Sequence, residues 1–144
     1  MINDSKPYID RLRSSGLRPT KQRLTICKVL FNRKETFHFT IEKLKKKIEK
    51  NTKSKVSLAT VYNTVHAFKN NGSLKEISLQ GNKTFFDTNS TNHHHFYDQD
   101  TGDLMDIKNE NIVVSKLPSA PKGKKIKEIV ITVSVANNNH NQKK

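Results

Sequence analysis

The sequence has few of the residues that build covalent or metal-based frameworks. Among its 144 residues there is one cysteine, Cys27, and no tryptophan. A single thiol excludes an internal disulfide and any zinc site built from several cysteines. The most apolar run, Ile129–Ala136, is far shorter than the roughly 20 residues that span a bilayer. The first ten residues, MINDSKPYID, lack the apolar segment of a signal peptide. We therefore expect a cytoplasmic protein with no membrane partner.

Acidic residues are also scarce. The chain has 13 Asp and Glu against 27 Lys and Arg, a net charge of +14. Residues 1–86 hold 19 of the basic and 6 of the acidic residues, whereas residues 87–144 hold 8 and 7. A positive field of this kind favours a polyanionic partner such as nucleic acid. The N-terminal part is therefore expected to make that contact.

Hydrophobic periodicity in residues 1–86 predicts helices followed by a hairpin. The expected helices cover residues 6–15, 21–32, 41–51 and 58–71, and the expected caps are Thr20, Thr40 and Ser57. Two alternating strands, LKEISL and KTFFD, flank a Gly81-Asn82 turn. This order is typical of a winged helix-turn-helix domain, which makes double-stranded DNA the expected partner.

The fourth expected helix has a core stripe of Leu58, Val61, Val65 and Phe68. Its opposite face carries small uncharged residues, among them Thr60 and Asn63, with Tyr62 on the flank and His66 given no role. Such a face can enter a major groove closely, where Asn can pair with adenine and a Thr methyl can touch thymine.

Residues 87–144 predict a smaller α/β domain, so the expected fold class is α+β with domains 1–86 and 87–144. A strand is expected to start near His93 and to end with residues 103–107. A short helix at 109–116, a long strand at 124–136 and a disordered tail complete the domain. The segment Ile129–Ile131 is apolar on both faces, which predicts a strand that is central or shared across a homodimer interface.

Three consecutive histidines lie between two groups of carboxylates. On a strand, His93 and His95 point to one side and His94 points to the other. Imidazole combined with carboxylate suits Fe(II), Mn(II) or Zn(II). The sequence therefore predicts a divalent-metal site in this stretch.

Several motifs resemble the ferric-uptake-regulator family of bacterial metal-responsive repressors. They are GLRPTKQR (16–23), SLATVYNTVHAF (57–68) and the histidine cluster. FFDTNSTNHHHFYDQDTGDLMDI and the later LP-x-x-PKG look most like the iron response regulator branch. The resemblance implies a dimer with an N-terminal winged helix, in which Arg18, Tyr62 and Asn63 read operator DNA. Arg18 would suit a narrow minor groove. Many relatives have Arg at the position of Asn63, which leaves the base preference there open.

The resemblance also implies a ligand set for the regulatory metal: His38, Asp87, His93, His95 and Asp106. In the iron response regulator branch the triplet His93-His94-His95 is associated with haem; the alternative is that His94 is incidental to the metal strand. The Cys-x-x-Cys of many relatives is replaced here by Asp98 and Thr101, so no four-cysteine structural zinc site can form.

Four functions fit these features. The first is a repressor that responds to iron or haem. The second keeps the fold but senses peroxide, because Asp87 and Asp106 resemble the carboxylate-rich ligand set of peroxide-sensing relatives. A metallohydrolase would also use a two-His, two-Asp site, but it lacks a strong general base and leaves the winged helix unexplained. A nucleic-acid packaging protein would bind with little sequence preference. We expect the regulator, not an enzyme.

Overall fold

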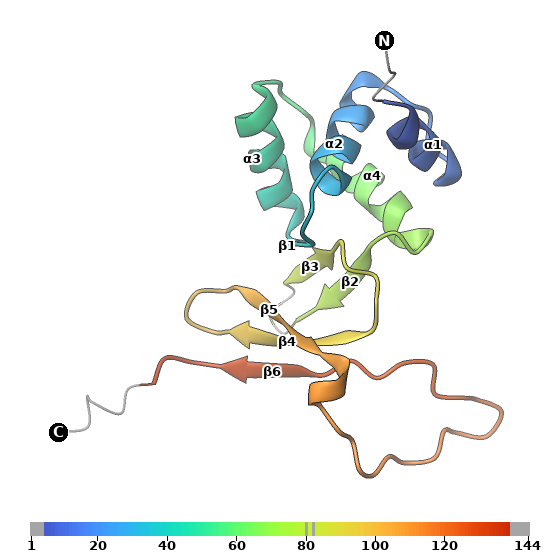
Figure 1. Ribbon diagram of the computed structural model, residues 1–144, viewed down its shortest axis with the longest axis vertical. Helices are drawn as coiled ribbons and strands as arrows, with labels where there is room; N and C mark the ends of the chain where they lie inside the picture. Colours follow the sequence, from blue (N-terminus) through green and yellow to red (C-terminus); the bar gives the residue numbers. More distant parts are fainter. Residues whose placement is uncertain (1–4, 80, 82, 139–144) are drawn as a thin grey trace. The chain divides into compact units, whose positions relative to one another are not determined.

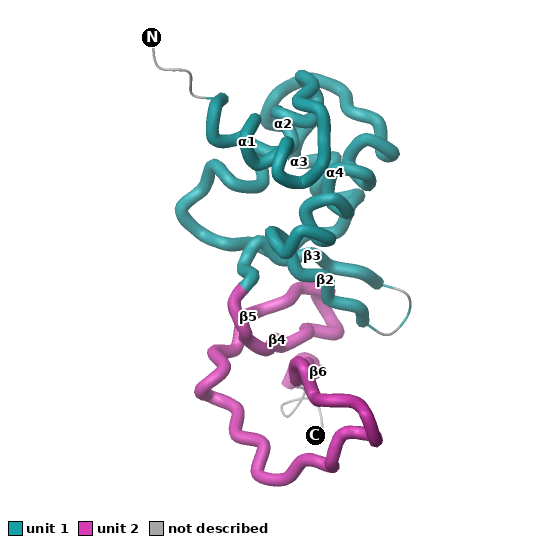
Figure 2. Tube along the Cα trace, turned by 90° about the vertical axis from the view of Figure 1, so that its right-hand side faces the viewer, with its two compact units in different colours: residues 1–90 teal, residues 91–144 magenta. Residues whose placement is uncertain are grey.

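A computed structural model describes residues 5–79, 81 and 83–138. It divides into two compact units, Met1–Ser90 and Thr91–Lys144 (Figure 2). The sequence alone places the junction after residue 86, whereas here Asp87 ends a strand of the first unit. The tail residues 139–144 lie outside the described part, as does Asn82 of the expected hairpin turn.

The first unit is a winged helix-turn-helix, as predicted (Figure 1). Its elements are α1 (Lys6–Ser14), α2 (Lys21–Phe31), β1 (His38–Phe39), α3 (Ile41–Thr52), α4 (Leu58–Asn70), β2 (Lys75–Ser78) and β3 (Thr84–Asp87). The three strands form an antiparallel sheet in the order β1-β3-β2. The two-residue strand β1 was expected to be a loop, and its pairing with β3 brings His38 opposite Asp87.

The helix starts follow from three polar caps. The side-chain oxygens of Thr20, Thr40 and Ser57 each accept a hydrogen bond of 3.1–3.2 Å from the backbone N–H three residues later. Each cap satisfies one of the four N–H groups that the first turn of a helix leaves without a partner. The three predicted caps are confirmed.

One apolar core holds the first unit together. Its buried members come from all four helices, from strands β1 and β3, and from the segments that precede α4 and β2: Leu12, Ile26, Cys27, Leu30, Phe39, Ile41, Leu44, Ile48, Val56, Val61, Val65, Phe68, Leu74 and Phe86. Leu58, expected in this core, is 48% exposed. It lies at the first position of α4, and the buried face of that helix begins only at Val61, with Thr64 taking part. The predicted stripe was wrong at its first residue.

The second unit is a three-stranded sheet in the order β5-β4-β6. Strand β4 (His93–Asp98) pairs antiparallel with β5 (Leu104–Lys108) and parallel with β6 (Thr132–Val135). The helix expected at 109–116 is only the 3-10 turn η1 (Asn109–Asn111), since Ile112 already has extended backbone angles. The long strand expected at 124–136 is reduced to the four residues of β6.

The second unit buries little apolar surface of its own. Among its described residues the buried hydrophobic side chains are Leu104 and Ile107. Nine large hydrophobic side chains stay exposed: Phe96, Met105, Val113, Val114, Leu117, Ile126, Ile129, Val130 and Val133. Within the described residues, no helix has the length and apolar character needed to cross a bilayer.

Candidate metal centre and nucleic-acid interface

In the first unit, strand pairing joins two of the expected metal ligands. His38 on β1 lies directly opposite Asp87 on β3, and His38 Nε2 is 3.2 Å from Asp87 Oδ2. The Asp87 side chain is fully buried, and its other oxygen accepts a 2.8 Å hydrogen bond from the Asn89 N–H. A buried carboxylate requires a partner of opposite charge or several donors, because its desolvation is costly.

In the second unit, the backbone sets the tautomer of His93. The Nδ1 atom of this ring is 2.7 Å from the carbonyl oxygen of Thr91. A carbonyl can only accept, so Nδ1 carries the hydrogen and a neutral ring presents a lone pair at Nε2. This is the arrangement that orients most metal-binding histidines, whose outer nitrogen donates to a carbonyl or carboxylate.

His93, His95 and Asp106 converge on one point. The Nε2 atoms of His93 and His95 lie 3.3 and 3.5 Å from the same oxygen, Asp106 Oδ1. One ligand atom from each of the three residues lies within 4.8 Å of the others. The cross-strand pairing of His95 with Asp106 and the alternation along β4 produce this cluster. A neutral His93 turns its Nε2 lone pair toward the carboxylate, which needs a cation or a shared proton between them, so this donor set fits a divalent ion.

His94 has the opposite tautomer. Its Nδ1 accepts a 2.9 Å hydrogen bond from the backbone N–H of Ile131, so in the neutral ring Nε2 carries the hydrogen. An imidazole in this state has no free lone pair for a metal. His94 therefore ties β4 to the residue that precedes β6, and the side chain plays no part in the cluster of His93 and His95.

This geometry does not support haem binding by the triplet. His93, His94 and His95 are only 7%, 4% and 2% exposed. An axial haem ligand needs an accessible nitrogen lone pair. His93 and His95 face Asp106, and His94 is held as a donor. The expectation rested on the resemblance to the iron response regulator branch, which cannot show burial or tautomer in this chain.

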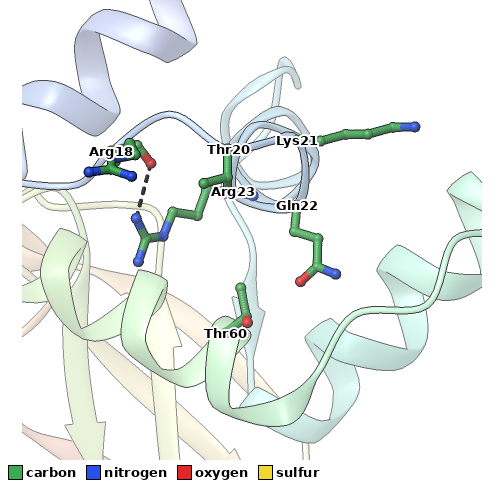
Figure 3. A pocket seen from close by; sticks show the side chains of 6 residues that line it. All are labelled: Arg18, Thr20, Lys21, Gln22, Arg23 and Thr60. Carbon is green, nitrogen blue, oxygen red and sulfur yellow. Dashed lines mark hydrogen bonds between the residues drawn. The ribbon is translucent and has the colours of Figure 1, made fainter.

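Two of the expected DNA contacts line one open hollow in the first unit. It measures about 630 Å³ and is lined by Arg18, Thr20, Lys21, Gln22, Arg23 and Thr60 (Figure 3). The guanidinium of Arg23 donates a 3.0 Å hydrogen bond to the Arg18 carbonyl. The Thr60 hydroxyl lies 2.7 Å from the Ser57 hydroxyl. The structure therefore brings Arg18 and Thr60 together between the starts of α2 and α4, on a strongly basic surface.

The other two expected DNA contacts, Tyr62 and Asn63, lie on the exposed face of α4. Tyr62 is 51% exposed and Asn63 is also exposed. The ring of Tyr62 stacks on His66, with 4.1 Å between ring centroids. Sequence reasoning gave His66 no role, although the spacing of four residues already placed the two rings on one helix face.

Comparisons with known proteins agree with this architecture. Residues 14–134 match the model of the ferric uptake regulator family. The chain is 30% identical over 99 residues to the peroxide-responsive repressor PerR of Staphylococcus aureus strain Mu50, a match that covers 69% of this chain. The match spans 65% of the length of that relative.

Two solved structures share the fold. The Vibrio cholerae ferric uptake regulator superposes with a TM-score of 0.65 at 21% identity, covering 90% of this chain and 98% of the other. The Pseudomonas aeruginosa regulator, solved with manganese, gives 0.65 at 23% identity, covering 90% and 97%. With the family match across residues 14–134, this chain belongs to the ferric uptake regulator family.

Proposed function

We propose that this protein is a divalent-metal-dependent transcriptional repressor that binds an operator in double-stranded DNA as a homodimer. The observation that carries the proposal is the convergence of His93 Nε2 and His95 Nε2 on Asp106 Oδ1, with His93 held in the ligating tautomer. Family membership and the basic first unit support it. The site of action would be the cytoplasm, where operator DNA lies.

The proposed metal would take ligands from both units: His38 and Asp87 from the first, and His93, His95 and Asp106 from the second. When bound, the ion supplies a positive charge that holds imidazoles and carboxylates in one arrangement. The Thr91 carbonyl keeps His93 Nε2 available, and the Asn89 N–H orients the Asp87 carboxylate. A metal ion that binds residues of both units can shift the protein's conformational population toward the state that binds DNA.

The proposed DNA contacts are Arg18, Thr60, Tyr62 and Asn63 in the first unit. The proposed dimer contact uses the second unit. Nine large hydrophobic side chains of this unit are exposed, including Phe96, Ile129 and Val133, whereas only two of its described hydrophobic side chains are buried. A second copy that covers this surface would complete the core of the second unit.

The leading signal is iron, which binds nitrogen and oxygen donors as a divalent ion. Peroxide sensing is the second candidate, favoured by the two carboxylates Asp87 and Asp106 and by the likeness to peroxide-responsive repressors. Peroxide treatment of the Fe(II) protein, followed by mass spectrometry, separates the two. One oxygen atom added to His38 or His93 would support peroxide sensing, and unmodified histidines would remove it.

We propose no catalytic role. His93, His95 and Asp106 would serve as ligands, which leaves no member of their cluster to act as the general base that a metallohydrolase requires. A search for metal-dependent turnover of phosphoesters or peptides tests this, and turnover that His95→Ala abolishes would contradict it.

The operator would be selected from a random DNA library in the presence of Mn(II), and its affinity would then be measured with and without metal. A regulator should prefer the selected site over random DNA by about a thousandfold or more at physiological salt. Loss of this preference on chelation, with its return on adding Mn(II), is the expected result. Equal affinity for all sequences would favour a packaging protein instead.

A further inference from the structure

Within the first unit, four aromatic rings connect the exposed face of α4 to the strands that carry His38 and Asp87. Tyr62 stacks on His66, with ring centroids 4.1 Å apart and the rings tilted by 34°. His66 meets Phe86 of β3 edge to face, at 5.6 Å and 77°. Phe86 stacks on Phe39 of β1, at 5.8 Å and 24°. Both geometries are favourable for aromatic pairs.

The far end of this ring series is next to two proposed metal ligands. Phe86 precedes Asp87 on β3, and Phe39 follows His38 on β1. The register pairs Phe39 with Phe86 and His38 with Asp87, so the two ring positions and the two ligand positions are consecutive rungs of one ladder. Phe86 and Phe39 are 1% and 2% exposed, which leaves them little room to move independently.

We propose that His66 is a positioning residue. It holds the Tyr62 ring for DNA contact and transmits a change at the His38–Asp87 rung to that ring through Phe86. The inference rests on the proposed function, because it takes Tyr62 as a DNA contact and His38 and Asp87 as metal ligands. The Tyr62 ring is half exposed, and its contact with the ring of His66 constrains it.

The first test uses protein with ¹³C-labelled tyrosine rings, of which the chain has three. Stacking displaces the Tyr62 ring signals from the positions of free tyrosine. His66→Ala should return them toward those positions, His66→Phe should keep them displaced, and Asn70→Ala on the same helix is the control. Tyr62 signals unchanged in His66→Ala would overturn the positioning role, and this readout needs neither metal nor DNA.

The second test adds Zn(II) to the same samples, with zinc binding followed independently by a chromophoric chelator. The wild type and His66→Phe should show Tyr62 signals that shift in step with zinc binding. His66→Ala should bind zinc with unchanged affinity but lose the shift. Zinc binding without any Tyr62 shift, or an equal shift in His66→Ala, would overturn the transmission. Failure of the wild type to bind zinc would instead contradict the proposed metal function.

A double-mutant cycle on the selected operator gives the last readout, since proximity alone does not establish coupling. His66→Ala should weaken operator binding about three- to tenfold, the range expected for one aromatic pair. The double variant Tyr62→Ala/His66→Ala should bind no more weakly than Tyr62→Ala alone. Additive losses would show that His66 acts independently of Tyr62 and would overturn the proposal.

Discussion

The backbone N–H of Ile131 donates a 2.9 Å hydrogen bond to Nδ1 of His94, which gives this histidine the opposite tautomer from His93. Two neighbouring histidines therefore differ in whether their Nε2 atom can bind a metal ion. His93 presents a nitrogen lone pair beside Asp106, and His94 presents an N–H. The difference is created by the Thr91 carbonyl and the Ile131 amide, which lie on different segments of the second unit.

Replacing His95 and replacing His94 should have different effects on metal affinity. We expect His95→Ala to lower Zn(II) or Mn(II) affinity by more than about a hundredfold, since loss of an outer hydrogen-bond partner alone costs roughly 10- to 100-fold. His94→Ala should leave metal affinity close to that of the wild type. It should cost about 1 kcal/mol of stability, because the Ile131 N–H loses its acceptor. Chelator competition and urea denaturation measure the two effects, and equal loss of metal affinity in both variants would contradict the tautomer assignment.

Haem should not bind specifically to the triplet. Because all three rings are buried, His93 and His95 face Asp106 and His94 is held as a donor, haem titration should give no saturable Soret shift that depends on His94. The matched control is the variant with His93, His94 and His95 all changed to Ala, which should give the same weak spectrum as the wild type. A stoichiometric shift that this variant loses would restore the haem hypothesis.

Much of the first unit could be predicted from the sequence, and the reason is local. Caps at Thr20, Thr40 and Ser57 and helical periodicity are short-range features, so the four helices follow from them. The 3-10 turn at Asn109–Asn111 and the short β6 were not predicted, because the apolar residues near them are exposed and no packing enforces a regular element. The tautomers of the histidines depend on tertiary hydrogen bonds, which composition and spacing cannot reveal.

The two kinds of DNA contact should respond differently to substitution. We expect Asn63→Ala to relax preference at one base pair of the selected operator by about 1–3 kcal/mol, since it would remove the proposed base contact of this residue. Arg18→Ala should weaken binding and reduce the slope of log affinity against log salt by about 1, because it would remove one proposed cationic contact with the DNA. Competition assays with single-base operator variants at several salt concentrations measure both. An unchanged base preference in Asn63→Ala would remove this residue from the reading face.

The cap of α4 should contribute measurably to stability. Ser57 Oγ accepts the Thr60 N–H at 3.1 Å, so Ser57→Ala should lower the free energy of unfolding by about 1 kcal/mol. Ser57→Gly should lower the free energy of unfolding by only a few tenths of a kcal/mol, because water can then reach the freed amide. Urea denaturation of the metal-free protein gives both values, with Ser54→Ala as a control for serine removal outside the cap. Equal stability of all three variants would contradict the capping role.

The thiol of Cys27 should be inert in the folded protein. Burial raises its pKa from 9.0 to about 11, and the nearby charge of Arg11 offsets only part of that effect. The thiolate is the reactive form, so native protein at pH 8 should resist iodoacetamide while urea-unfolded protein reacts readily. Because the folded pKa is the higher one, the thiol's contribution to stability is complete below pH 9 and is lost as the pH rises toward 11.

Denaturation at pH 8 and pH 10.5 should therefore show a loss of stability at alkaline pH that is smaller in Cys27→Ala. The Cys27→Ala variant also contains a cavity, so it should be less stable than the wild type at both pH values. The change in stability between the two pH values, compared between wild type and variant, therefore reports the ionisation of the thiol. If iodoacetamide labelled the native protein at pH 8 as fast as the urea-unfolded protein, Cys27 would be accessible in the folded state. In that case the thiol would have to be considered as a second redox-sensitive group beside the histidines.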